Sequence, residues 1–305
     1  MAKEHRSSPW RAQCKQDKAF DIVNTIIMVI MFFIFAWPLW FVLIASFSDP
    51  SATWNGDVLL WPVGFNLDCY KEVFKYTDLW IGYRNTIFYT VVGTIINLIM
   101  TVCAAYPLSR KDFMMRNFFM VMFMVTMYFS GGLIPTYLVV QQLNMLNTIW
   151  AILIPSACSI FNVIITRTYF QTNIPETLQE AAELDGANTF QFLTRIVLPL
   201  SGPILAVMAL YYGVGRWNSF FDALIYLQDK ELYPLQMFLR NILIQNTVNV
   251  NTITVSDPAQ QAAKAQLAQT IKYGVIVVAS VPLLCIYPFV QKYFVKGVMI
   301  GAIKG

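Results

Sequence analysis

Long apolar stretches run through most of this chain, and they constrain its fold more than any other feature. A helix needs about 20 apolar residues to cross the hydrocarbon layer of a membrane. Six stretches are long enough, at about residues 22–47, 85–107, 117–140, 148–170, 199–227 and 273–291. Backbone polar groups inside a bilayer must be satisfied within the protein, so each stretch is expected to be an α-helix. The sequence therefore predicts an all-α membrane protein with six transmembrane helices.

The composition excludes several classes of protein. Hydrophobic residues make up 57% of the 305 residues and charged residues 12%, whereas a soluble globular domain has about 45–50% and about 25%. A soluble enzyme, a disordered scaffold and a disulfide-rich secreted domain are therefore not expected. The net charge of +4 is small and no long basic tract is present, so we predict no nucleic-acid partner.

The cysteines and the single histidine argue against a disulfide framework and a metal site. The cysteines are far apart, odd in number and form no CxxC pair. They are Cys14, Cys69, Cys103, Cys158 and Cys285. His5 lies in the polar N-terminal tail, so it cannot act at bilayer depth. We predict no catalytic residue, no metal and no cofactor in this chain.

The positive charges predict the orientation in the membrane, because short cytoplasmic loops are enriched in Lys and Arg. Most of the 21 Lys and Arg residues lie in the two tails and in the loops after the second and fourth stretches. Both termini are therefore expected to be cytoplasmic. The predicted parts are an N-terminal tail over 1–21, a transmembrane domain over 22–298 with external loops at about 48–84 and 228–272, and a C-terminal tail over 299–305.

The third apolar stretch carries a concentration of small and helix-bending residues. Ser130-Gly131-Gly132 is followed by Pro135. Small side chains allow backbones to approach closely, and proline or glycine bends a helix. We predict a kink or a close helix contact at this point.

A polar loop at about 171–198, between the fourth and fifth stretches, differs from the rest of the chain. Pro175 suits the first turn of a helix, and Gly186 offers a C-terminal stop that tolerates a positive φ. The acidic residues at helical spacing are Glu176, Glu180 and Glu183, and the small residues between them are Ala181 and Ala182. The pattern predicts a short acidic helix outside the bilayer, whose small residues would let another protein approach. A solvated helix with acidic residues near its N-terminus has the same pattern.

The spacing in this loop resembles the signature loop of importer-type ABC transporter permeases. That loop has Glu-Ala-Ala, three residues, Gly, nine residues, Ile, one residue and Leu-Pro. The matching positions here are Glu180, Ala181, Ala182, Gly186, Ile196, Leu198 and Pro199. EAAELDGAN and RIVLPLSGP are similar to the carbohydrate-uptake branch, which includes the maltose permease. SGGLIPTY, RTYFQTNIP and GRWNSFFDALIYL resemble its LplC-type sub-branch.

This resemblance implies a type I ABC importer permease fold in a bacterial inner membrane and a set of partners. A second homologous permease subunit would complete the pathway, an ATPase dimer would power it, and an extracytoplasmic binding protein would deliver an oligosaccharide. A different second permease is usual, and a homodimer stays open. The chain has no GxxxxGK[ST] loop, so ATP and Mg would be bound by the separate ATPase and this chain is not expected to be an enzyme.

The resemblance also assigns residues. The loop at 171–198 would be the coupling helix that sits on the ATPase. Its coupling residues would be Glu180, Ala181, Ala182, Asp185, Gly186, Leu198 and Pro199. Lys296 and Lys304 lie in a basic tail that would contact the ATPase subunits, although a frayed positive tail fits the same residues.

The fifth stretch holds the residues expected to line the substrate pathway, because polar groups are costly in lipid and face a cavity or the bundle interior. The candidates are Tyr211, Arg216, Trp217, Asn218 and Asp222. Trp217 would stack on a pyranose ring, and Arg216 would suit a uronate. An Arg216–Asp222 structural pair, or an end of the stretch at the headgroups, is the alternative.

Other functions stay open beside an importer of oligosaccharides such as alginate or pectin fragments. An importer permease for another solute class would carry the same loop. A membrane-embedded enzyme would need paired carboxylates or a metal cluster, and Asp222 is the single candidate within the apolar stretches. A channel or a scaffold would not predict the Glu-Ala-Ala loop. The external segment 228–272 is long enough to be functional, either reaching toward a binding protein or forming a passive cap.

Overall fold

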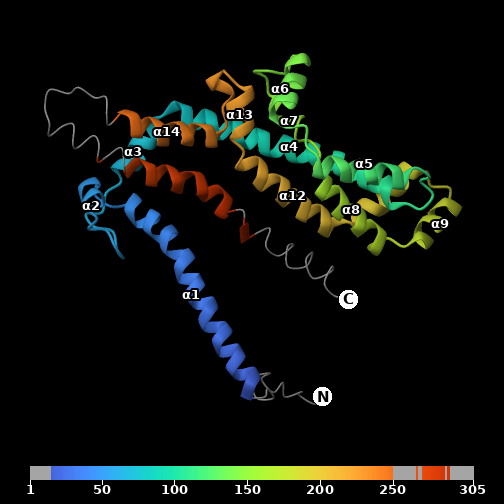
Figure 1. The fold of residues 1–305 in the computed structure, drawn as a ribbon, viewed down its shortest axis with the longest axis horizontal. Coiled ribbons are helices and arrows are strands. Elements are labelled where there is room, and N and C mark those ends of the chain that lie inside the picture. The colour runs from blue at the N-terminus through green and yellow to red at the C-terminus, as the bar shows by residue number, and fades with distance from the viewer. Residues whose placement is uncertain (1–14, 250–265, 267–269, 286, 289–305) are drawn as a thin grey trace. The chain divides into compact units, whose positions relative to one another are not determined.

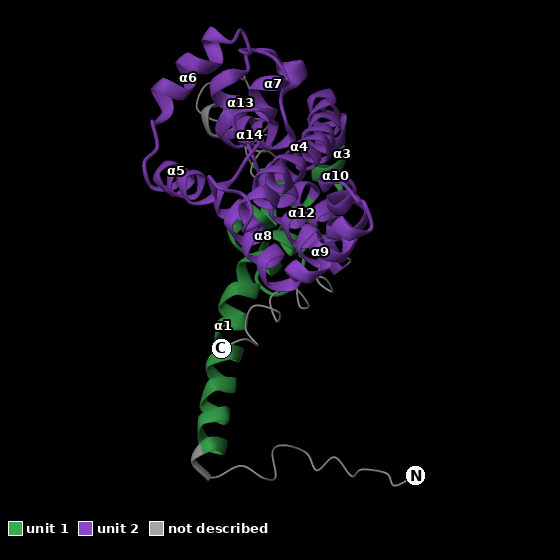
Figure 2. Cartoon of the chain, turned by 90° about the vertical axis from the view of Figure 1, so that its right-hand side faces the viewer, with its two compact units in different colours: residues 1–72, 252–277 green, residues 73–251, 278–305 purple. Residues whose placement is uncertain are grey.

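The structure is a computed structural model that describes residues 15–249, 266, 270–285 and 287–288. All regular elements in these ranges are helices (Figure 1), so the prediction of an all-α chain is confirmed for them. The chain forms two compact units, shown in different colours in Figure 2. One comprises 1–72 and 252–277, and the other 73–251 and 278–305. The predicted boundaries of tails and transmembrane domain stay a prediction.

The first unit is dominated by α1 (Lys15–Ser46). Its most apolar part has no buried residue, and Phe32, Phe33 and Leu39 are all exposed. A helix that is apolar all round and not covered by its own chain is typical of a membrane span. This helix corresponds to the first predicted span.

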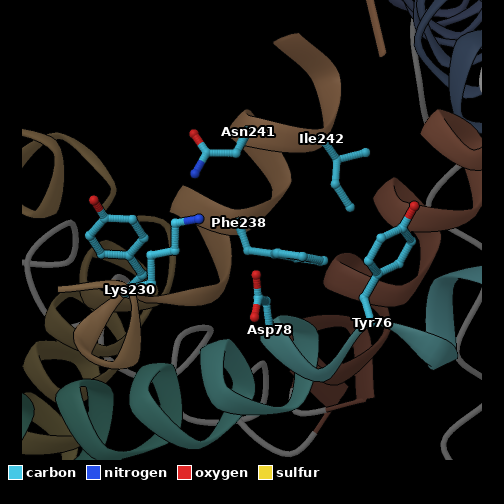
Figure 3. Close-up of a pocket in the computed structure, with 7 residues that line it drawn as sticks. Tyr76, Asp78, Lys230, Phe238, Asn241 and Ile242 are labelled. Carbon is cyan, nitrogen blue, oxygen red and sulfur yellow. The ribbon is translucent and has the colours of Figure 1, made fainter. Parts of the chain in front are cut away.

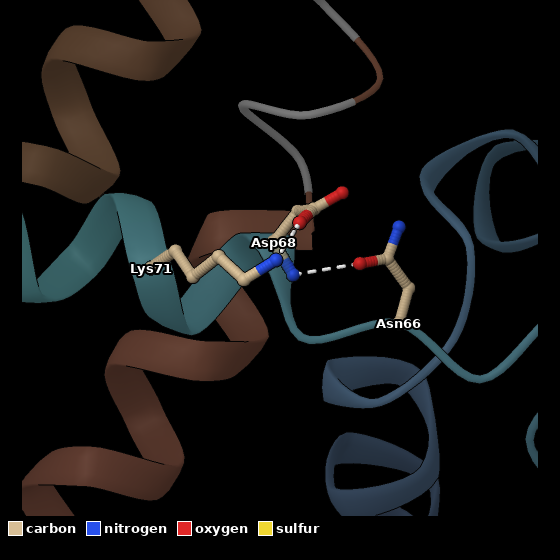
Figure 4. A network of polar contacts seen from close by, with 3 residues as sticks. All are labelled: Asn66, Asp68 and Lys71. Atoms are coloured by element: carbon tan, nitrogen blue, oxygen red, sulfur yellow. Dashed lines mark hydrogen bonds and ion pairs between the residues drawn. The ribbon is translucent and has the colours of Figure 1, made fainter.

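Short helices follow α1 in the first unit. Asp49 accepts a hydrogen bond from the Ser51 amide at 2.8 Å and caps α2 (Pro50–Asn55). At the start of α3 (Asp68–Lys75), the Asn66 side chain accepts from the Asp68 amide at 2.7 Å, and Lys71 pairs with Asp68 at 2.8 Å (Figure 4). The boundary between the two units falls inside α3.

The second unit is organised around α4 (Thr77–Ser109), a 33-residue helix. Three helices pack against it: α8 (Ile160–Asn173), α12 (Gly202–Trp217) and α14 (Leu235–Asn249). Gly82 lets the start of α14 come close, because a Cβ atom there would lie 3.0 Å from the Leu235 Cα. At 1.5 Å per residue, α4 is about 50 Å long, which exceeds the thickness of a hydrocarbon layer.

Two helices within the described ranges are long and apolar enough to cross a membrane alone, Asp17–Ser46 and Thr77–Ser109. Two bent pairs would raise this to four if each pair were one span. In the first pair, α5 (Arg116–Tyr128) and α6 (Leu133–Gln142) meet at 113°, and Gly132 between them has a φ of +86°. The predicted kink at Ser130-Gly131-Gly132 is confirmed.

The fourth and fifth predicted spans are not single helices. In place of one helix over 148–170, α7 (Trp150–Leu153) is separated from α8 by an irregular segment containing Pro155. Since proline has no amide donor and blocks the preceding turn, it favours such a break. In the fifth stretch, α12 ends at Trp217 and α13 (Phe221–Tyr226) follows.

The remaining elements connect these helices. The acidic loop forms α9 (Glu176–Leu184), α10 (Thr189–Phe192), the π-helix η2 (Leu193–Val197) and α11 (Leu198–Leu200). The run from Thr189 to Leu200 meets α12 at 80°. The 3-10 helix η3 (Lys230–Leu232) precedes α14, and an apolar helix covers Thr270–Cys285. Lys296 and Lys304 lie outside the described residues.

Candidate functional site

The acidic loop folds as a helix that ends at a glycine in the left-handed region. Gly186 has a φ of +79°. Its amide donates to the Glu183 carbonyl at 3.0 Å, and the Ala187 amide donates to the Ala182 carbonyl at 2.9 Å. These two bonds form a Schellman motif, which satisfies carbonyls that the helix end would otherwise leave free. The predicted helix and its glycine stop are confirmed.

The chain turns directly from α9 into a second capped helix. The Asn188 side chain accepts from the Gln191 amide at 2.8 Å, and the Gln191 side chain accepts from the Asn188 amide at 3.0 Å. This reciprocal capping box starts α10. Lys111 also pairs with Glu176 at 3.0 Å, which links the start of α9 to the loop after α4. The loop is therefore a folded helical hairpin.

The hairpin has one buried side and one exposed side. Ala182 and Phe192 are buried in an apolar cluster that also contains Tyr106 of α4 and Phe170 of α8. The predicted coupling residues on the exposed side are Glu180, Ala181, Asp185, Gly186 and Pro199, while Leu198 is half-buried. Of the predicted small pair, only Ala181 is accessible, because Ala182 faces the bundle.

Two large apolar side chains stand out on the exposed side of the hairpin. Leu184 is 90% exposed and Phe190 is 72% exposed. They flank the turn at Gly186. Their signal in the sequence is a pair of large apolar residues inside a polar loop, and our reading of that loop through its acidic and small residues missed it. These two side chains would add apolar area to any contact that another protein makes with this side of the hairpin.

Arg110 joins the end of α4 to the hairpin. Its guanidinium lies 5.1 Å from the ring centre of Tyr106 and 5.4 Å from that of Phe192. The side chain is buried, and its Nε and Nη2 have no hydrogen-bond acceptor among the described residues. The cation is therefore held by the faces of two rings, an interaction that strengthens when water is excluded. No residue spacing in the sequence points to this contact.

Arg216 of α12 donates hydrogen bonds to backbone carbonyls at the break between α7 and α8. Its Nη1 donates to the Ile152 carbonyl at 2.5 Å, and its Nη2 donates to the Leu153 and Ser156 carbonyls, each at 3.1 Å. Nη2 also donates to the Asn97 side chain at 2.9 Å. The last carbonyls of a helix have no partner within the helix and carry partial negative charge, so a buried cation stabilises them.

Two of the predicted pathway residues, Arg216 and Trp217, are buried in this structure. Arg216 is 7% exposed and its donors are occupied by backbone carbonyls, so it is not open to a uronate. Trp217 is buried, with its Nε1 3.4 Å from the Ala279 carbonyl and its ring edge-to-face with Tyr83. Its ring is not open to a pyranose. Within the described part of the chain, no Arg216–Asp222 ion pair forms either.

The other pathway candidates are accessible. Tyr211 and Asn218 are exposed, and Asp222 on α13 is half-buried. Tyr211 and Gly215 of α12 and Asn218 at its C-cap follow each other at helical spacing, and all three are exposed. Of the five predicted residues, Arg216 and Trp217 are therefore buried in the helix bundle. The other three remain accessible. In the described residues, no group of three or more His, Cys, Asp or Glu side chains could hold a metal ion.

Comparison with known proteins gives one consistent result. Residues 78–300 match the family described as the binding-protein-dependent transport system inner membrane component. Protein LplC of Bacillus subtilis (strain 168) is 40% identical over 95% of this chain and 97% of its own length. The polygalacturonan/rhamnogalacturonan transport system permease protein YtcP of the same organism is 37% identical over 95% of this chain and all of its own length.

A solved structure shares the fold. It is the crystal structure of a bacterial ABC transporter involved in the import of the acidic polysaccharide alginate. One of its chains is 34% identical, with a TM-score of 0.83, over 92% of this chain and 99% of that chain. The family match over residues 78–300 includes α4 from its second residue, the hairpin and α12, which are the elements that carry the site described above.

Proposed function

Because this chain belongs to the family of binding-protein-dependent transport system inner membrane components, we propose that it is the permease subunit of an ATP-driven importer of oligosaccharides. The observation that carries the proposal is the hairpin at α9 and α10. It is a rigid, capped unit with an exposed acidic and apolar face, and its buried side packs on α4 and α8. A force applied to that face would be passed to the bundle as a whole.

We propose separate partner subunits for ATP binding, for the second half of the pathway and for delivery of the sugar. ATP and Mg would be bound by a dimer of separate ATPase subunits, since the sequence contains no phosphate loop. A second permease would supply the other half of the pathway, and an extracytoplasmic binding protein would deliver the sugar. Six spans with both termini in the cytoplasm, in a bacterial inner membrane, complete the proposal. Lys296 and Lys304 would contact the ATPase.

Coupling would proceed through the hairpin. When the ATPase dimer closes on ATP, α9 would move with it and draw the ends of α4 and α8 along, because Ala182 and Phe192 are buried against them. The bundle would then open to the outside while the binding protein is docked. Hydrolysis would return it. Glu180 and Leu184 lie on the exposed face and would meet the ATPase directly.

Acidic oligosaccharides are the substrates we favour. One relative at 37% identity transports polygalacturonan and rhamnogalacturonan by name, and the similar solved transporter imports alginate. Both materials are built from uronate-containing chains. Tyr211, Asn218 and Asp222 would line the path, with hydroxyl, amide and carboxylate groups suited to sugar hydroxyls.

The test uses the complete transporter reconstituted in vesicles with its binding protein. We expect uptake of oligogalacturonate or oligoalginate to exceed uptake of neutral maltotriose. Glu180→Lys should insert normally but lose the stimulation of ATPase activity by the loaded binding protein. Asp112→Lys is the matched control, because Asp112 is an exposed acid in the neighbouring loop. Equal stimulation in wild type and Glu180→Lys would contradict the coupling role, and the absence of any sugar uptake would contradict the function.

A further inference from the structure

A small pocket lies at the end of α4 that is farthest from the coupling hairpin. The hairpin packs on residues near the C-terminus of α4, such as Tyr106, while the pocket involves its first residues. The cavity measures about 140 Å³ and lies wholly within the second unit (Figure 3). Its lining residues are Tyr76, Asp78, Lys230, Tyr233, Phe238, Asn241 and Ile242. If the hairpin is cytoplasmic, as proposed, this pocket is on the external side.

The walls of the pocket are fixed to α4 by specific hydrogen bonds. The Asn85 side chain donates to the Glu231 carbonyl at 2.6 Å and to the Tyr233 carbonyl at 3.0 Å. The Tyr89 hydroxyl donates to the Leu232 carbonyl at 2.9 Å. The Leu235 amide donates to the Thr86 hydroxyl at 2.8 Å. These bonds hold η3 and the start of α14 in place, so the cavity does not require a ligand to form it.

The lining combines aromatic rings with groups that donate and accept hydrogen bonds. Tyr76 and Phe238 meet edge to face at 6.0 Å. The Lys230 amine and the Asp78 carboxylate point toward the space beside Phe238 (Figure 3). Neither forms an ion pair with another described residue. The pocket therefore offers a cation, an anion and the Asn241 amide beside an apolar wall.

We propose that this pocket binds one pyranose ring of the transported oligosaccharide, as an entry subsite on the external side. This inference rests on the proposed function. A cavity of about 140 Å³ is close in size to the engineered cavity of about 150 Å³ that holds benzene, so it can receive one face of a sugar ring while the other substituents stay outside it. A pyranose has an apolar C–H face for the aromatic wall. Its hydroxyls both donate and accept, which matches a carboxylate, an amine and an amide.

The two charged side chains of the pocket would bind different groups of the sugar. Asp78 would accept from sugar hydroxyls, and Lys230 would donate to a hydroxyl or to a uronate carboxylate. Hydrogen bonds to charged groups are the stronger ones. Removing either charge should therefore weaken sugar binding by about ten- to hundredfold, which is the usual loss for one such bond.

The experiment uses the intact permease–ATPase complex in detergent, without the binding protein. Binding of trigalacturonate and of maltotriose is measured by isothermal titration for the wild type, Asp78→Asn and Lys230→Gln. Glu231→Gln is the control, because Glu231 is an exposed acid next to Lys230 whose side chain does not line the pocket. We expect weaker binding in both pocket variants and unchanged binding in the control. In vesicles that contain the same variants, with the binding protein present, uptake should show a higher KM and an unchanged kcat. A larger loss for trigalacturonate in Lys230→Gln would identify the uronate carboxylate as its partner.

Three outcomes would overturn the assignment. Unchanged sugar binding in Asp78→Asn and Lys230→Gln, in a transporter that still takes up oligosaccharide, would refute the subsite and leave the proposed function intact. Loss of stimulation by the binding protein, with unchanged sugar binding, would make the pocket a contact for that protein. A wild-type complex that takes up no oligosaccharide would refute the subsite together with the function. Thermal unfolding of each variant shows that it is folded.

Discussion

Arg216 is a charged residue in an apolar stretch of the sequence. Its side chain is buried in the structure, so a substrate cannot reach it. It connects α12 to the broken end of α7 and to Asn97 of α4. A glycine makes this possible, because a Cβ atom at Gly93 would lie 2.9 Å from the Arg216 Nε. The planar guanidinium reaches four acceptors at once, which a lysine cannot do. At this scale the chain uses a buried charge to hold irregular backbone inside a membrane domain.

Arg216→Lys is expected to destabilise the protein by about 2–3 kcal/mol, because carbonyls of the broken helix lose their donors. Gly93→Val should have a similar effect by displacing the guanidinium. Thermal unfolding of the complex in detergent measures both. Arg195→Lys is the control, since Arg195 is exposed. If Arg216→Lys and Arg195→Lys unfold at the same temperature, the bonds to the α7 carbonyls do not stabilise the bundle.

Arg110 carries a second prediction at the residue scale. The cation lies between two rings without a hydrogen-bond acceptor in the described chain, so its attachment depends on ring faces and packing. Arg110→Ala should cost about 1–3 kcal/mol and loosen the hairpin. We expect fewer sugar molecules transported per ATP hydrolysed, measured in vesicles. Asp112→Ala removes an exposed charge from the same loop that forms no ion pair with another described residue, and it should leave this ratio near the wild-type value. An unchanged ratio in Arg110→Ala would show that the contact does not transmit force.

The hairpin is the element whose stability depends most on one residue. A Cβ atom at Gly186 would meet nothing within 4 Å, so substitution there tests backbone conformation alone. Gly186→Ala should cost about 1 kcal/mol because of the positive φ, and Gly186→Asn should cost less. Gly202→Ala is the matched control, with equally open space but without a positive φ. ATPase stimulation by the binding protein is expected to fall in the order wild type, Asn, Ala, and Gly186→Pro should abolish it. Full stimulation in Gly186→Pro would contradict the role of the turn.

Elements with strong local signals were predictable from the sequence. Pro175 and Gly186 bound α9, and the Ser130-Gly131-Gly132 run marks the 113° bend between α5 and α6. The break after α7 was not predictable, because Pro155 alone is compatible with a continuous membrane helix. What stabilises the break is Arg216, more than 60 residues away. The burial of Trp217 was not predictable either, because its partners Tyr83 and Ala279 are distant in the sequence and come from other helices.

At the scale of the whole molecule, the proposed orientation makes Cys69 a reporter of the external side. The thiol is buried in the first unit and donates to the Ser46 carbonyl at 3.4 Å. Burial disfavours the thiolate and raises the pKa of Cys69 to about 11. The thiolate is the reactive form, so in a variant with Cys14, Cys103, Cys158 and Cys285 changed to Ser, labelling at pH 7.5 should be slow.

The pH dependence of the labelling rate reports the burial of the Cys69 thiol, and the side from which the reagent reacts reports the orientation of the chain in the membrane. The reactive fraction should rise about tenfold for each pH unit between 7 and 9, because the pKa of Cys69 is above this range. An impermeant maleimide should react from the outside only, and Asp57→Cys in the same segment, which is exposed, should react rapidly from the same side. Lys111→Cys should react only after the inner face is made accessible. Labelling of Asp57→Cys from the inside would reverse the orientation, and with it the side on which the hairpin can meet an ATPase.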